Sequence, residues 1–231
     1  MMQIHCFESA AEIAARLATR LESALFGPAA AGTAVMLAGG RTPLAAYRTL
    51  AARGTRPSAA LVFLSDERMA PADSEESNAR HVAPPLRKVG LKDERFLRVD
   101  TTLPPEEAAA AYHAVLADLV SRGVRMEFGL LGLGPDGHTA SLFSAADVEA
   151  ARRSGRMAVA VRRPQPPDRV SVTPGLLAMV AQLVFVVTGG EKAAIVRQLL
   201  DHPLNLPAGL ATDGHPNVHL WVDRAALPAN R

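Results

Sequence analysis

The residues best suited to proton transfer lie in one short glycine-rich segment. It reads Leu131-Gly132-Leu133-Gly134-Pro135-Asp136-Gly137-His138-Thr139-Ala140-Ser141 and places a carboxylate two residues before a histidine. Histidine titrates near neutral pH, so it can accept and return a proton, and a nearby carboxylate can orient or polarise it. We therefore expect Asp136 and His138 to be catalytic residues. The alternative is a capped turn with a hydrogen-bonded histidine.

The same glycines match a dinucleotide-binding pattern without its context. Gly132, Gly134 and Gly137 have the spacing G-x-G-x-x-G. However, no acidic residue follows about twenty positions later at the end of a second strand, and Asp136 would lie where a pyrophosphate approaches. We expect no nicotinamide and no other cofactor. We also expect no metal, because no Cys/His cluster has ligand spacing; His215 and His219 are four apart with Pro216 between them.

A second segment, Ala38-Gly39-Gly40-Arg41-Thr42-Pro43, has residue types that bind anions. Glycines let the backbone approach a ligand closely, Thr42 suits the N-cap of the next helix, and Pro43 suits its first turn. Free N–H groups and the helix dipole would then point at an anion, with Arg41 and the Thr42 hydroxyl as further donors. We expect Gly39, Gly40, Arg41 and Thr42 to bind substrate; a tight turn without a ligand is equally compatible.

Other charged residues follow apolar runs. Asp66, Glu67 and Arg68 come directly after one such run, Arg169 begins Arg169-Val170-Ser171, and Lys192 follows Gly189-Gly190. Each cation could hold a phosphate or could be a solvated surface charge. Asp66 could instead cap a turn, and Glu67 and Arg68 could form a solvated pair. We expect Asp66, Arg68, Gly137, Arg169 and Lys192 to contact substrate.

Short apolar runs alternate along the chain with stretches of helical periodicity. The runs typical of buried strands are 35–37, 61–64, 128–131, 157–161 and 183–187. Helices are predicted where Ile13, Leu17, Leu21 and Leu25 recur every four residues, from Pro104 to Gly123, and after Gly190. Strands separated by helices predict an α/β fold, a three-layer α/β/α sandwich with a mostly parallel sheet covered on both faces. Ligands bind at the carboxyl ends of such strands, where the segments above begin.

The composition is that of an ordinary globular protein. Of 231 residues 48% are hydrophobic and 21% charged, so we expect a single domain over residues 1–231. A net charge of +2 argues against a nucleic-acid partner, and no apolar run is long enough to span a membrane. Without a secretory signal and with Cys6 as the single cysteine, a cytoplasmic location is the default. The stretch Arg162-Arg163-Pro164-Gln165-Pro166-Pro167 is expected to be a surface loop or a mobile flap.

Together the segments resemble the 6-phosphogluconolactonase family, between about Val35 and Asp223. The matching motifs, in order, are Gly39-Gly40-x-Thr42-Pro43, Asp66-Glu67-Arg68 with Ser77-Asn78, Gly132-x-Gly134-x-Asp136-Gly137-His138-Thr139-Ala140-Ser141-Leu142-Phe143, Arg169-Val170-Ser171, Gly190-x-Lys192-Ala193 and Pro207-Ala208. The chain departs from the family at Ala38 and Arg41, where serines are usual, and at Ser144, where proline is usual.

The resemblance implies a fold and a reaction. The fold would be the modified Rossmann-like type of glucosamine-6-phosphate deaminases and ribose-5-phosphate isomerases. The activity would be that of a hydrolase converting 6-phosphoglucono-1,5-lactone to 6-phosphogluconate, in the second step of the oxidative pentose phosphate pathway, by general-base activation of water. The only partner implied is the small phosphorylated lactone, with the chain a monomer or small homo-oligomer.

Two alternatives belong to other functional classes. One is a phosphosugar isomerase or deaminase; the related deaminases carry a glutamate after the D-G-H core, where this chain has Ser141-Leu142-Phe143-Ser144, and read D-E-Y in place of Asp66-Glu67-Arg68. The other is a non-catalytic phosphosugar-binding domain of a regulator. The sequence offers no segment for the DNA-binding helix-turn-helix of such a regulator, and both differences from the deaminases favour the lactonase.

Overall fold

The computed structural model describes residues 2–228 and contains two β-sheets. The larger sheet is parallel throughout, and its strands lie in the order β1 (Gln3–Phe7), β10 (Val218–Asp223), β9 (Leu183–Val187), β6 (Arg125–Leu131), β2 (Thr33–Leu37), β3 (Leu61–Leu64) and β5 (Phe96–Leu97). The smaller sheet is antiparallel, in the order β4 (Asp66–Arg68), β8 (Arg169–Val172) and β7 (Ala158–Val161).

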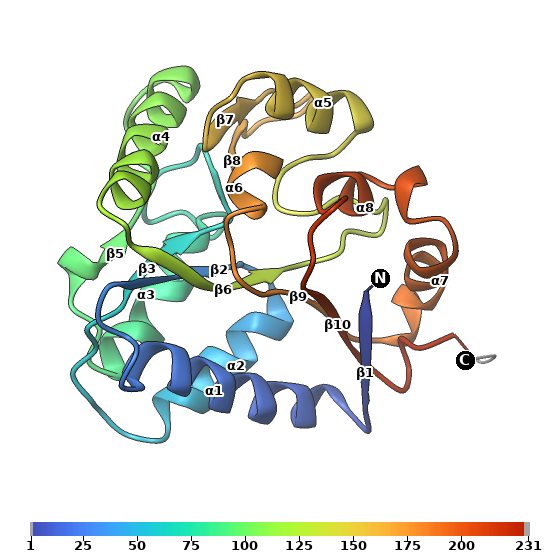
Figure 1. Cartoon of the computed structure of the whole chain (residues 1–231), viewed down its shortest axis with the longest axis horizontal. Coiled ribbons are helices and arrows are strands. Elements are labelled where there is room, and N and C mark those ends of the chain that lie inside the picture. The colour runs from blue at the N-terminus through green and yellow to red at the C-terminus, as the bar shows by residue number, and fades with distance from the viewer. Residues whose placement is uncertain (1, 229–231) are drawn as a thin grey trace.

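Helices cover both faces of the larger sheet (Figure 1). One face carries α1 (Ala10–Phe26), α2 (Arg41–Ala51) and α3 (Asn78–Lys88). The other carries α4 (Pro105–Ser121), α5 (Ala145–Arg153), α6 (Pro174–Leu177), α7 (Ala193–Asp201) and α8 (Pro207–Ala211), together with the smaller sheet. Short 3-10 turns are η1 (Asp93–Arg95), η2 (Gly190–Lys192) and η3 (Pro203–Asn205). This confirms the predicted three-layer α/β/α sandwich.

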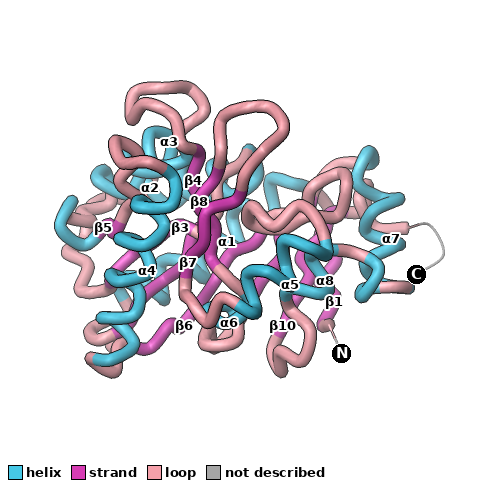
Figure 2. Tube along the Cα trace, turned by 90° about the horizontal axis from the view of Figure 1, so that it is seen from above, coloured by secondary structure: helices cyan, strands magenta, loops and turns pink. Residues whose placement is uncertain are grey.

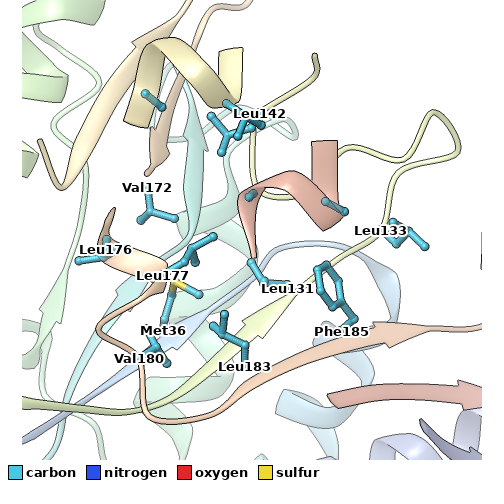
Figure 3. Packing of buried hydrophobic residues seen from close by; sticks show 14 of the residues in the cluster. Met36, Leu131, Leu133, Leu142, Val172, Leu176, Leu177, Val180, Leu183 and Phe185 are labelled. Atoms are coloured by element: carbon cyan, nitrogen blue, oxygen red, sulfur yellow. The ribbon is translucent and has the colours of Figure 1, made fainter. Parts of the chain in front are cut away.

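Each face of the sheet buries its own hydrophobic cluster. In α1 the stripe of Ile13, Leu17, Leu21 and Leu25 is fully buried, and Ser9 caps the helix by accepting a hydrogen bond from the backbone of Glu12. On the opposite face, Figure 3 shows residues of adjacent strands and of α6 packed together. Burial of this apolar surface is the main stabilising contribution to the sandwich.

The strand prediction for residues 157–161 is right about the strand and wrong about its sheet. β7 pairs antiparallel with β8 outside the larger sheet, and its two central residues, Val159 and Ala160, are only partly buried. A continuous apolar run has no periodicity that distinguishes a doubly covered strand from one in a small accessory sheet. The helices predicted over 13–25, over 104–123 and after Gly190 are confirmed by α1, α4 and α7.

The strands of the larger sheet bring their carboxyl ends to one edge. Leu37 of β2 pairs with Leu64 of β3, and Leu131 of β6 pairs with Phe185 of β9, so the loops that follow emerge together. After β3 the chain leaves the sheet through Ser65, whose N–H donates to Leu37 O at 2.8 Å and whose carbonyl accepts from Val172 N at 2.9 Å. Figure 2 shows β4, β8 and β7 side by side above the larger sheet. In the described part of the chain, no helix is long and apolar enough to cross a membrane.

Candidate active site

The loop after β6 holds a histidine against a carboxylate. His138 Nδ1 lies 2.5 Å from Asp136 Oδ1, and the backbone N–H of His138 also donates to this oxygen at 3.3 Å. The loop is closed by hydrogen bonds from Gly134 N to His138 O (2.8 Å) and from Gly137 N to Gly134 O (3.1 Å). At the turn Gly137 has a φ of +80°, a conformation that glycine adopts without strain. The predicted contact between Asp136 and His138 is therefore present.

The contact with His138 favours the ionised form of Asp136, and the ionised carboxylate in turn selects the tautomer of His138. Partial burial acts to raise the pKa of Asp136, but the hydrogen bond and charge interaction with His138 outweigh it, so the pKa lies below its usual value. An ionised carboxylate only accepts hydrogen bonds, so Nδ1 of His138 must carry the proton in their shared bond. In a neutral imidazole this leaves Nε2 unprotonated and able to act as a base.

His138 opens on a cavity of about 170 Å³ at the edge of the sheet. Its lining combines the loops that follow β2, β3 and β6 with strand β4 and the start of α3: Ala38, Gly39, Gly40, Ser65, Asp66, Arg68, Asn78, Gly132, Leu133, Gly134, His138 and Ala140. Three of the polar side chains predicted from the sequence, Asp66, Arg68 and His138, meet here. A base and a guanidinium thus face the same small space.

Asp66 connects this cavity to the loop that carries His138. One carboxylate oxygen accepts a hydrogen bond from Ser65 Oγ at 2.8 Å, and the other accepts one from Ser141 Oγ at 2.7 Å. Ser171 Oγ in turn accepts from Ser141 N at 3.1 Å. Asp66 therefore ties β4 to the loop that carries His138, and Ser171 ties β8 to the same loop.

Asn78, at the first position of α3, connects β4 to the glycine-rich turn. It is 3% exposed and donates from Nδ2 to the Asp66 carbonyl at 3.0 Å. A Cβ at Gly39 would lie 2.0 Å from Asn78 Oδ1, so only glycine allows this close approach. The sequence motif included Asn78, but we did not predict it as a site residue.

Glu67 points away from the cavity and holds the start of α3. It is 1% exposed and accepts hydrogen bonds from the backbone N–H groups of Arg68, Asn78 and Ala79 at 2.7–2.8 Å. Burial raises the pKa of Glu67 despite these three donors. The alternative of a solvated Glu67–Arg68 pair is therefore wrong. Glu67 fixes Arg68 and Asn78 relative to each other.

A larger cavity of about 520 Å³ adjoins the first and shares Gly39, Gly40, Gly132 and Leu133 with it. Its other lining residues come mainly from the start of α2 and from the segment after β9: Ala10, Arg41, Thr42, Pro43, Ala45, Val186, Val187, Thr188, Gly189, Glu191, Lys192 and Asp223.

Hydroxyl groups and an ammonium group line the larger cavity. Thr42 Oγ1 lies 2.8 Å from Thr188 Oγ1, and Lys192 Nζ donates to the Leu133 carbonyl at 2.8 Å. The pKa of Lys192 lies below its usual value mainly because the ammonium group is partly buried. The negative charges of Glu191 and Asp136 act in the opposite direction and raise this pKa. The larger cavity therefore offers hydroxyl donors, a cation and the amino end of α2 to a ligand.

The glycine-rich turn differs in detail from the prediction. α2 begins at Arg41 with Gly40 as its N-cap residue, at a φ of +98°, so Thr42 is not the N-cap. Glycine takes the cap because the backbone there is left-handed. The Thr42 hydroxyl is consequently free to meet Thr188. Arg41 has a side chain 98% exposed, 3.9 Å from Glu191 at the cavity mouth.

Arg169 lies beside Arg68 but lines neither cavity. The two residues pair in register between β4 and β8, and Arg169 donates to the carbonyls of Pro167 and Asp168. Burial lowers the pKa of Arg169 first of all, and the positive charge of Arg68 lowers it further. Gly137 and Asp136 also lie outside both linings, one serving the turn and the other His138.

Three polar residues of the larger cavity, Thr188, Glu191 and Asp223, escaped the sequence reasoning. Thr188 follows β9 directly, and Asp223 ends β10, where its carboxylate accepts hydrogen bonds from Gly189 N at 3.1 and 3.2 Å. Their positions at the carboxyl ends of strands were a usable signal, but β10 itself was not predicted. His219, by contrast, lies within β10 and is hydrogen-bonded to His5, Gln182 and Asn217.

Comparisons with known proteins show the family to which this chain belongs. A family model described as glucosamine-6-phosphate isomerases/6-phosphogluconolactonase matches residues 7–221. The 6-phosphogluconolactonase of Thermotoga maritima is 34% identical over 173 residues, which cover 74% of this chain and 76% of the relative.

Solved structures are similar over nearly the whole chain. A crystal structure of 6-phosphogluconolactonase from Thermotoga maritima aligns with a TM-score of 0.80 and 28% identity, covering 97% of this chain and all of the other. A monomeric glucosamine-6-phosphate deaminase, 18% identical, aligns with a TM-score of 0.72 over 97% of this chain and 98% of its own, which shows a common fold. On the match over residues 7–221, this chain belongs to the glucosamine-6-phosphate isomerase/6-phosphogluconolactonase family.

Proposed function

We propose that the protein hydrolyses 6-phosphoglucono-1,5-lactone to 6-phosphogluconate, with His138 as the general base. The observation that carries this proposal is the Asp136–His138 pair, whose histidine opens on the same small cavity as Arg68. A lactone is an activated ester, so its hydrolysis needs a water molecule, a base and a place for negative charge. The named activity of the 34% identical relative supports this reaction over others of the family.

The first step is attack of water on C1 of the lactone. Water donates its proton to Nε2 of His138 as its oxygen bonds to C1, and the carbonyl electrons move to the exocyclic oxygen. The imidazolium formed is stabilised by Asp136, 2.5 Å from Nδ1. Proton transfer of this kind typically contributes about 10²–10⁴-fold to the rate.

The second step opens the ring. The electrons return to the carbonyl, the bond between C1 and the ring oxygen breaks, and His138 gives its proton to that oxygen, which becomes the C5 hydroxyl. The acid formed at C1 loses its proton to solvent. Arg68 and the backbone N–H groups of the glycine turn are the donors nearest to the charge on the exocyclic oxygen; one such donor is worth roughly 3–4 kcal/mol.

The larger cavity suits the 6-phosphate. The first N–H groups of α2 have no acceptor within their helix, and the helix dipole favours an anion at that end. Thr42, Thr188 and Lys192 surround the same space with side-chain donors. Holding the phosphate there would fix C1 in the adjoining cavity, and such orientation is a large part of catalysis. Arg41, at the mouth, can add a further cation, and Arg169, paired in register with Arg68, adds positive charge beside the smaller cavity.

The isomerase and deaminase alternative lacks a matching acid in this chain. No Asp or Glu occurs between Gly137 and Ala146. The first acid after His138 is Asp147, and its carboxylate accepts hydrogen bonds from the backbone of Phe143 and Ser144 as part of the capping box of α5, in which Ser144 is the N-cap. Asp147 is thus engaged in the fold, which leaves His138 without a second acid of the deaminase type.

The decisive assay follows the loss of 6-phosphoglucono-1,5-lactone, prepared in situ, with and without the purified protein. We expect a saturable rate far above the slow spontaneous opening. His138→Ala should lower turnover by at least about 10²-fold with its thermal midpoint retained. A folded wild-type protein that does not accelerate lactone loss would exclude the proposed function, and phosphosugar isomerisation and phosphosugar binding would be measured next.

We further propose a cytoplasmic location and a monomer or small homo-oligomer without a nucleic-acid partner. The net charge of +2 supports the last point. Cell fractionation and light scattering of the purified protein test the first two.

A further inference from the structure

The loop between β7 and β8 brings an arginine toward the catalytic histidine. This loop is fastened at both ends: Arg162 forms ion pairs with Glu106 and Asp168, both at 2.6 Å, and Arg163 N donates to Asp168 Oδ1 at 2.9 Å. The side chain of Arg162 is thus held by two carboxylates, whereas the side chain of Arg163 contacts an aromatic ring.

The guanidinium of Arg163 stacks on Phe143. Its central carbon lies 3.7 Å from the centre of the Phe143 ring, well within the range of a cation–π contact. The Phe143 ring in turn lies 4.6 Å, centre to centre, from the imidazole of His138. Arg163, Phe143 and His138 thus form a continuous series of contacts, in which the planes of the Phe143 and His138 rings are tilted by 46°. Among residues 2–228, no carboxylate forms a salt bridge with Arg163.

The Phe143 ring limits a motion of the His138 ring that Asp136 cannot limit. A single hydrogen bond at Nδ1 fixes one atom of the His138 ring but leaves the ring free to rock about that bond. The Phe143 ring, packed against the imidazole at a tilt of 46°, limits this rocking and so fixes the direction of Nε2. Phe143 needs an anchor for this purpose; its backbone has one in Asp147, and its ring has one in Arg163.

We propose that Arg163 is a positioning residue of the active site, which acts through Phe143 to hold the His138 imidazole in its productive orientation. Arg163 and Phe143 are absent from the linings of both cavities, whereas Arg68 lines the smaller one. Arg163 therefore acts on the histidine and not on the substrate. This inference rests on the proposed function, because it assumes that His138 transfers the proton.

The test compares Arg163→Ala, Arg163→Lys and Arg163→Gln in the lactone assay. Loss of a partly exposed cation–π contact predicts a kcat about 3- to 30-fold lower in the alanine and glutamine variants. KM should stay within about twofold, because no substrate contact is removed. Arg163→Lys should recover most of kcat, since an ammonium group can also lie over the ring. Arg162→Gln is the matched control and should stay within about twofold of wild type, because within residues 2–228 the side chain of this exposed neighbour pairs only with Glu106 and Asp168.

A double-mutant cycle tests the route through Phe143. In a Phe143→Leu background, Arg163→Ala should cause little further loss of kcat, because the element on which Arg163 acts is gone. Independent, additive losses would overturn the proposal. So would a raised KM with an unchanged kcat, or an equal loss in Arg162→Gln, which would assign the effect to loop placement.

A readout without turnover separates this inference from the function itself. The imidazole carbon–proton resonances of His138, assigned by their absence in His138→Ala, should shift or broaden in Arg163→Ala and remain in place in Arg162→Gln. An inactive wild type would exclude the lactonase proposal, but these spectra would still show whether Arg163 orients the His138 ring. An active wild type with unchanged kcat and spectra in Arg163→Ala would sink only the role of Arg163.

Discussion

A single methyl group placed at Gly134 should separate catalysis from folding. Gly134 precedes the catalytic pair, and a Cβ built there would lie 2.1 Å from His138 Nδ1 and 2.6 Å from Asp136 Oδ1. The backbone cannot yield easily, because Gly134 N donates to the His138 carbonyl and Gly134 O accepts from Gly137 N. In Gly134→Ala the imidazole and the carboxylate must therefore move.

The size of the movement sets the expected loss. Ordinary van der Waals contact for a Cβ begins at 3.4 Å, so the imidazole must retreat by more than 1 Å from its present position. A misplacement of about 1 Å in a catalytic constellation can cost about 10²-fold in rate. We expect kcat for the lactone to fall about 10²-fold. We expect little loss of stability, because Gly134 has no positive φ and alanine restricts the unfolded chain.

The assay combines lactone turnover with thermal unfolding of the same preparations. Gly175→Ala is the control for a glycine-to-alanine change, because a Cβ there meets its nearest atom at an ordinary 3.6 Å. That variant should match wild type in kcat. If Gly134→Ala were as stable as wild type and turned over as fast, the observed geometry of Asp136 and His138 would not be the catalytic one.

Three further predictions concern the residues around the pair. Asp136→Asn should lower kcat about 10²-fold or more with KM little changed, because an amide no longer stabilises the imidazolium; an unchanged kcat would remove Asp136 from the mechanism. Lys192→Met should raise KM about 10- to 100-fold through loss of a charged donor, with kcat affected less; the reverse pattern would place the phosphate elsewhere. Glu67→Gln should be less stable than wild type, since one amide oxygen cannot accept all three backbone N–H groups. Because the folded-state pKa of Glu67 is raised, wild type loses stability as pH rises from about 4.5 through that pKa, and the variant does not. The deficit of Glu67→Gln in urea unfolding should therefore shrink with rising pH; a deficit that grows would show that the ionised form is the stabilised one.

The sequence predicts the layers well because the hydrophobic pattern identifies the buried helices and strands that form them. The α1 stripe could be predicted from burial on one face, and the apolar runs of the parallel strands from burial on both faces. The short strands β4, β5 and β8 carry no such signal, since they are two to four residues long or polar. β1 and β10 contain histidines and a tryptophan that weaken the pattern of a buried strand.

The candidate site was predictable to the extent that it follows the ends of strands. Asp66, Arg68 and His138 come to one cavity because parallel strands end at one edge, and the sequence order of the motifs places them there. Arg169 illustrates the limit of this rule. Its side chain folds back on the carbonyls of Pro167 and Asp168, a direction that depends on the course of the preceding loop.

Asp66 and Glu67 show why residue type alone does not assign a role. Both are acids that follow a buried strand, yet one bridges Ser65 and Ser141 beside the cavity, and the other caps α3 on the far side. Successive residues of a strand point to opposite faces, so adjacent acids must diverge. Which of them faces the ligand depends on the turn at Ser65, where the chain leaves the larger sheet. That turn directs Arg68 and the Asp66–Ser141 hydrogen bond toward the loop that carries His138. The smaller sheet therefore sets the distance between the base, His138, and the cation, Arg68.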